Sequence, residues 1–278
     1  MQTEAALGDS SCWLPGLAPR MVARFWRDAS FDLKPADYTT AGWLTRPQRA
    51  VQQPPIAQLD FAGATLLVEA ATPVVAAELD ENGLSLASLI QVQAATDTLH
   101  TALACLNKLP SLSATVGALA RSIHILTPAE AGFDVSHSNP AIPFSIFLSV
   151  PTGEAQSAWR TAESIVHEAM HLQLSLIERE VPLVGDRNED VGFSPWQRRA
   201  RPLQGLLHGM YVSSVIGQMF AHVSPLLMED RETHRFINQR RQDIANELEA
   251  VASLPSAVGL TVQGARFARH LLSQVARC

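Results

Sequence analysis

One short stretch, SIVHEAMHLQLSLIERE at residues 164–180, holds the residue types best suited to chemistry. His167 and His171 are four residues apart and Glu168 follows the first histidine, which makes the pattern H-E-x-x-H. Residues at i and i+4 of an α-helix lie on the same face, so both imidazoles can bind one metal ion. Most neighbouring residues are apolar, which predicts a buried helix whose polar groups need a partner such as a metal.

A tight metal site needs a third protein ligand, and two downstream residues are candidates. Glu189, in the charged segment GDRNEDVG, would complete a zinc peptidase site, or it is a solvated loop acid. His208, in the apolar segment RPLQGLLHGMYV, is the favoured ligand, and its alternative is a hydrogen-bonded core histidine. Gly205 and Gly209 flank His208 at helical spacing and would let another helix approach closely.

The segments SIVHEAMH and SPWQRRARPLQGLLHGMYV together resemble the HExxH-type peptide β-hydroxylases, which are iron- and 2-oxoglutarate-dependent enzymes that modify ribosomally synthesised peptides. The preceding segment HSNPAIPFSIFLSVP also fits this family, and the resemblance covers roughly residues 120–225, the expected metal-site core. It implies that His167, His171 and His208 bind Fe(II). It also implies 2-oxoglutarate as co-substrate and a precursor peptide, hydroxylated at a side-chain β-carbon, as partner.

A keto acid also requires a cation for its distal carboxylate, and a guanidinium binds a carboxylate through two hydrogen bonds. Arg198, Arg199 and Arg201 stand just before the predicted His208 helix. Arg201 is favoured because it directly precedes Pro202 at the helix start, and Arg198 is a further candidate. The alternative is a solvated basic turn.

The role of Glu168 separates two enzyme classes. In a zinc metallopeptidase with Glu189 as third ligand, Glu168 would be the general base for a metal-bound water. In an oxygenase it would orient a ligand or the substrate through hydrogen bonds, although Glu168 and Glu189 both remain rivals for a coordination position. A third interpretation is a peptide-binding partner without enzymatic activity.

The elements that must position these residues follow from hydrophobic periodicity, proline and glycine. The expected fold is α+β, mostly helical, with a zincin-like core in which a small sheet precedes the H-E-x-x-H helix. One domain is expected over residues 1–278, with residues 1–80 irregular except for a short helix around RMVARFWRDA. Helices are predicted near 85–109, 155–180, 203–223, 229–253 and 260–276, strands at 119–127 and 142–150, and a polar loop at 182–202.

The loop and strand before the metal helix suggest a place for the peptide. Ser136, His137, Ser138 and Asn139 are expected at the rim of a cleft. The strand at 142–150 would then offer its edge to an extended peptide, and its alternative is an ordinary core strand.

Composition excludes other classes of protein. A hydrophobic fraction of 47% in 278 residues supports a sizeable core, and a net charge of −6 argues against nucleic-acid binding. Three cysteines without a C-x-x-C pair indicate a reducing compartment. Neither a secretory signal nor a run of about 18 apolar residues is visible, so a cytoplasmic protein outside the membrane is expected.

Overall fold

A computed structural model describes residues 11–28, 55–128, 133–140, 142, 144–185, 191–227 and 230–275. The chain forms two compact units, and each is described by itself. The sheet unit is Ala18–Leu172, and the helical unit is Met1–Leu17 with Gln173–Cys278. The protein is mixed α and β, and 59% helix in its described part confirms the mostly helical class. The single domain stays a prediction.

The sheet unit is built around a sheet of six strands among its described residues, with the order β1-β2-β4-β6-β5 and with β3 paired to β4. Strands β2, β4 and β6 are parallel, whereas β1, β3 and β5 run antiparallel to their partners. All four residues of β6 are buried, as parallel strands usually are. The strands are β1 (Ala57–Phe61), β2 (Ala64–Val68), β3 (Ser85–Leu86), β4 (Ser122–Thr127), β5 (Ser136–His137) and β6 (Ser145–Leu148).

Strand β6 lies inside the sheet and not at its edge. It pairs with β4 on one side and with β5 on the other, where His137 lies opposite Phe147. The expectation that segment 142–150 offers a free edge to a peptide is therefore wrong, and the core-strand alternative is confirmed. Asn139, which was expected at the rim of a cleft, donates from Nδ2 to Glu78 Oε1 at 2.8 Å, which ties this loop to helix α3 (Pro73–Glu81).

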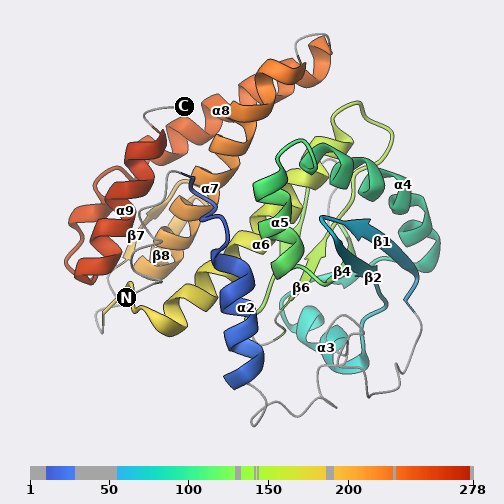
Figure 1. Ribbon diagram of the computed structural model, residues 1–278, viewed down its shortest axis with the longest axis horizontal. Coiled ribbons are helices and arrows are strands. Elements are labelled where there is room, and N and C mark those ends of the chain that lie inside the picture. The colour runs from blue at the N-terminus through green and yellow to red at the C-terminus, as the bar shows by residue number, and fades with distance from the viewer. Residues whose placement is uncertain are drawn as a thin grey trace. The chain divides into compact units, whose positions relative to one another are not determined.

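Helices surround this sheet (Figure 1). Helix α4 (Leu89–Leu106) begins with a capping box between Ser88 and Gln91 and packs against β1, while α5 (Pro110–Leu119) packs against β2. The helix predicted near 85–109 ends before Pro110, and Pro110 begins the next helix, because the first turn of a helix does not use its N–H groups. The remaining helices are α2 (Leu17–Asp28) and α6 (Ser157–Glu180), and the residues of α6 from Gln173 onward belong to the helical unit.

The hairpin β1–β2 and α3 occupy part of the segment expected to be irregular. Phe61 lies opposite Ala64, and the two turn residues Ala62 and Gly63 have φ values of 51° and 76°. Two positive φ values are typical of a type I′ hairpin turn. The usual Asn-Gly signal is absent here, so the turn was not recognised in the sequence.

The helical unit consists of α7 (Leu203–Val223), α8 (Arg231–Ala250), α9 (Val262–Val275) and a hairpin of β7 (Val191–Ser194) and β8 (Arg199–Pro202). Helix α7 packs against α8, α9 and both strands (Figure 1). The hairpin occupies part of the segment predicted to be a polar loop. The sequence did not predict it, because Pro202 and the charged residues nearby do not form a period-2 apolar pattern. Of the helices described, none combines the length and apolar character needed to cross a membrane.

Candidate metal centre

Helix α6 carries the H-E-x-x-H residues, as the sequence predicted. The apolar side chains within and beside the motif are at most 3% exposed, whereas the His167 side chain is 40% exposed. One face of α6 is therefore held in the core while the histidine face is partly open. The buried residues are Ile165, Val166, Ala169, Met170 and Leu172.

The imidazoles of His167 and His171 converge. Their Nε2 atoms are 3.2 Å apart, and the ring centroids are 4.8 Å apart with an interplanar angle of 65°. Two nitrogens each about 2.1 Å from one ion would be about 3.0 Å apart at a right angle and about 3.4 Å apart in a tetrahedron. The observed separation lies between these values, so the pair fits a shared metal ion.

Glu168 is buried beside this pair. It is 2% exposed, and its Oε1 lies 3.8 Å from His167 Nε2. Among the described residues, no hydrogen bond reaches its carboxylate. A carboxylate at this distance would attract a cation bound by the two imidazoles. The position of Glu168 is therefore compatible with a metal ion.

The third ligand stays a prediction. Across the described ranges, no group of three or more His, Cys, Asp or Glu side chains is arranged to hold a metal ion. Glu189 lies outside the described residues. His208 belongs to the helical unit, where it contacts another residue of that unit, Glu178.

Glu178 was not singled out in the sequence, yet the structure pairs it with His208. Its Oε2 lies 3.0 Å from His208 Nε2 and accepts a hydrogen bond from Gln204 Nε2 at 2.8 Å. Because an ionised carboxylate can only accept, Nε2 is the donor in this contact. A signal was present, since Glu178 follows His171 by seven residues, which is two helical turns.

The arginines predicted to bind the keto-acid carboxylate lie on or beside the hairpin β7–β8. A Cβ at Gly205 would lie 2.9 Å from Arg201 Nε, so the Arg201 side chain lies against α7 three residues before His208. Within the described part of the chain, Arg201 forms no ion pair. Arg198, with φ +50°, and Arg199 are exposed at the hairpin turn.

Gly205 and Gly209 make room for side chains and not for another helix, which corrects the expectation from their spacing. A Cβ at Gly209 would lie 2.5 Å from the Trp196 ring, as one at Gly205 would meet Arg201. The glycines therefore let the hairpin pack onto α7, and this packing orients Arg201.

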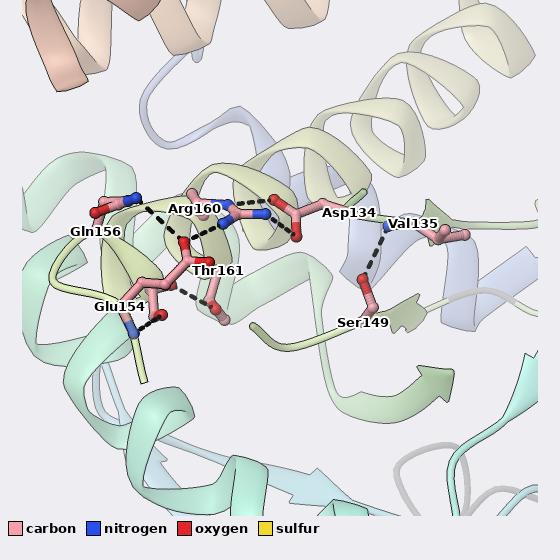
Figure 2. Close-up of polar contacts among 8 residues, drawn as sticks. Asp134, Val135, Ser149, Glu154, Gln156, Arg160 and Thr161 are labelled. Carbon is pink, nitrogen blue, oxygen red and sulfur yellow. Dashed lines mark hydrogen bonds and ion pairs between the residues drawn. The ribbon is translucent and has the colours of Figure 1, made fainter. Parts of the chain in front are cut away.

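A polar network anchors the start of α6, as Figure 2 shows. Arg160 donates from Nε and Nη2 to the two carboxylate oxygens of Asp134 at 2.8 and 3.0 Å, and from Nη1 to Glu154. The hydrogen bond with Asp134 raises the pKa of Arg160, against the opposing effect of burial. Arg160 precedes His167 by seven residues, so the network holds the helical face that bears the histidines.

A second polar cluster has the residue types of a hydrolase triad but not its arrangement. Ser122 Oγ donates to the Glu69 carboxylate and lies 3.2 Å from His124 Nε2, whereas His124 Nδ1 faces the Glu69 carbonyl at 3.1 Å. These three residues are at most 6% exposed, and burial lowers the pKa of His124 to about 4. The cluster therefore belongs to the core of the sheet and is closed to a substrate.

No protein-family model matches the chain, and no curated protein matches it in sequence. The function is accordingly inferred from the geometry of the H-E-x-x-H pair and from the motifs around it.

Proposed function

We propose that the protein is an Fe(II)- and 2-oxoglutarate-dependent dioxygenase that hydroxylates a side-chain β-carbon of a ribosomally synthesised precursor peptide. The observation that carries the proposal is the 3.2 Å approach of His167 Nε2 to His171 Nε2 beside the buried Glu168 carboxylate. This geometry supports a metal site. The choice of iron and a keto acid follows the resemblance of SIVHEAMH and SPWQRRARPLQGLLHGMYV to peptide β-hydroxylases.

In this proposal His167 and His171 hold the ion, and His208 supplies the third ligand. The contact of His208 Nε2 with Glu178 supports this role, because a metal-binding histidine commonly donates its other N–H to a carboxylate. When bound, iron and the keto acid would let dioxygen oxidise a C–H bond to a C–OH group, with one oxygen atom entering the hydroxyl group and the other entering succinate as the keto acid loses carbon dioxide. The protein's own residues position these groups and the peptide.

Arg201 binds the distal carboxylate of 2-oxoglutarate in the proposed site. Two observations support this role: its side chain lies against Gly205, one turn before His208, and it has no carboxylate partner in the described chain. Arg198 is the further candidate, and its exposure at the hairpin turn makes it the weaker one. A guanidinium suits this task because it can donate two parallel hydrogen bonds.

Glu168 acts in this proposal as an orienting group. Its burial and its 3.8 Å approach to His167 support a role in holding a ligand or the substrate. We also propose that the sheet and α6 form a zincin-like core. The order of a small sheet followed by a helix with one buried face and one histidine face supports this assignment.

A zinc metallopeptidase is the second candidate, and the position of Glu168 beside the histidine pair favours it. There Glu168 would be the general base for a metal-bound water, and Glu189 would be the third ligand. Arg201 favours the oxygenase, because a peptidase has no keto acid to bind. Replacing Glu168 by Gln would abolish a peptidase but leave an oxygenase with some keto-acid turnover.

Anaerobic reconstitution with ferrous iron and 2-oxoglutarate tests the proposal before any peptide is known. We expect a weak metal-to-ligand charge-transfer band in the visible spectrum, and succinate release once air is admitted. The His167→Ala variant should show neither signal. Tightly retained zinc, with no band and no succinate from the wild-type protein, would overturn the oxygenase and support the metallopeptidase.

A further inference from the structure

His137 and Glu78 face one another at the edge of the six-stranded sheet, and the proposed iron chemistry uses neither. His137 ends the short strand β5 and Glu78 lies on helix α3, and both residues belong to the sheet unit. The His137 Nε2 atom is 3.6 Å from Glu78 Oε1, and each side chain is 25% exposed. This separation is too long for a hydrogen bond, which joins nitrogen and oxygen at about 2.7–3.2 Å.

One atom of each side chain lacks a hydrogen-bond partner. His137 Nε2 and Glu78 Oε2 are both buried atoms, and neither forms a hydrogen bond with any residue that the structure describes. The other carboxylate oxygen is satisfied, because Oε1 accepts from Asn139 Nδ2 at 2.8 Å and from Asn82 Nδ2 at 3.2 Å. Buried polar atoms normally have a partner, so the two unsatisfied atoms indicate that one more group binds here.

A metal ion satisfies both atoms at once. Imidazole nitrogen and carboxylate oxygen are common zinc ligands, and each lies about 2.0–2.2 Å from the ion. Two ligand atoms of a tetrahedral ion are about 3.4 Å apart, which is close to the observed 3.6 Å. The pair of His208 and Glu178 differs, because its 3.0 Å contact has the length of a hydrogen bond and leaves neither side chain unsatisfied.

The core of the sheet unit holds both ligands in place. The ring of Phe147 on β6 lies beside the His137 imidazole, with ring centroids 6.0 Å apart. Phe147 belongs to a buried apolar cluster that includes Val75 and Leu79 of α3. Glu78 directly precedes Leu79, so the same cluster positions the helix that carries the carboxylate and the strand that carries the imidazole. Ligands held in this way need little rearrangement to bind an ion.

We propose that His137 and Glu78 bind a divalent transition-metal ion such as zinc, with water completing its coordination. Strand β5 has two residues and pairs with β6 alone among the described strands. An ion shared by β5 and α3 therefore fastens this short edge strand to the body of the unit. Its role is structural, because an ion that binds the folded protein alone stabilises it. The inference does not depend on the proposed iron site or on hydroxylation.

Zinc binding to the full-length protein with both His167→Ala and His171→Ala tests the inference, because these changes remove the H-E-x-x-H pair as a competing site. We expect about one zinc ion per chain in equilibrium dialysis and a Tm that rises with zinc concentration. Magnesium at the same concentration should do neither, because Mg²⁺ prefers oxygen ligands. A simple ion pair between His137 and Glu78 would leave the protein without zinc, and that result would overturn the inference, as would equal effects of the two metals.

Further changes in the same protein then locate the zinc ion. His137→Ala removes one of the two protein ligands and should weaken zinc binding at least about tenfold. Glu78→Gln keeps the size of the side chain but removes its charge, and it should weaken zinc binding at least about tenfold as well. His100→Ala is the matched control, since His100 is exposed on α4 of the same unit. Unchanged zinc affinity in either ligand variant would place the ion elsewhere and reject the site, so Glu78→Gln still decides if His137→Ala does not fold.

Discussion

His208 and Glu178 form a histidine–carboxylate pair, with Nε2 and Oε2 3.0 Å apart and both side chains 14% exposed. Gln204 donates to the same carboxylate oxygen at 2.8 Å and so holds it in place. A carboxylate fixed in this way orients the imidazole and determines which ring nitrogen keeps its proton. The proposal that His208 is the third metal ligand can therefore be tested by changing either residue of this pair.

Replacing Glu178 by Gln should lower the affinity for ferrous iron by about 10- to 100-fold, the usual effect of removing a group that orients a metal ligand. His208→Ala should lower it at least as much, because the ligand itself is lost. Iron titration of each variant measures both effects, with His234→Ala on α8 as the control. Normal iron binding by His208→Ala, together with lost binding by Glu189→Ala, would reject His208 as the ligand.

Replacing Arg201 by Gln should raise the KM for 2-oxoglutarate by about 10- to 100-fold, as expected for the loss of charge-assisted hydrogen bonds. Succinate release at varied keto-acid concentration measures it. Arg199→Gln, on the same strand and exposed, should leave the KM unchanged. A larger effect from Arg199→Gln or Arg198→Gln than from Arg201→Gln would contradict the assignment.

Replacing Gly209 by Ala should lower the free energy of unfolding by about 1–3 kcal/mol, because the new Cβ would overlap the Trp196 ring. Urea denaturation measures the change. In a Trp196→Ala background the same substitution should cost much less, since the overlapping ring is absent, and the double-mutant cycle gives the coupling. Equal costs in both backgrounds would show that Trp196 does not pack at Gly209.

Stability should depend on pH through His124, whose pKa burial lowers from 6.5 to about 4. Between these values the unfolded chain binds a proton that the folded protein does not bind. The stability that depends on neutral His124 is therefore fully present above pH 6.5. It is lost as the pH falls towards 4, which lowers the free energy of unfolding by about 3 kcal/mol at most. The loss of unfolding free energy between pH 7 and about pH 4.5 should be smaller in His124→Asn, and an identical loss would contradict this account.

Local patterns were sufficient for the main helices and for the convergence of the two histidines in the proposed metal site. The predicted helix at 203–223 coincides with α7, because apolar residues at helical spacing report burial directly. The convergence of His167 and His171 follows from the same periodicity, since two residues four apart share one helical face. Glycine spacing was less informative. Gly205 leaves room for the Arg201 side chain and Gly209 for the Trp196 ring, whereas the spacing had suggested room for another helix.

The sequence by itself determined that His167, Glu168 and His171 lie on one helix and that the two histidines share a face of it, because both features depend on near neighbours in the chain. Only the tertiary structure decided that β6 is an inner strand and that Glu178 meets His208. These features join residues far apart in sequence, and such contacts depend on how whole elements pack. No local pattern contains that information.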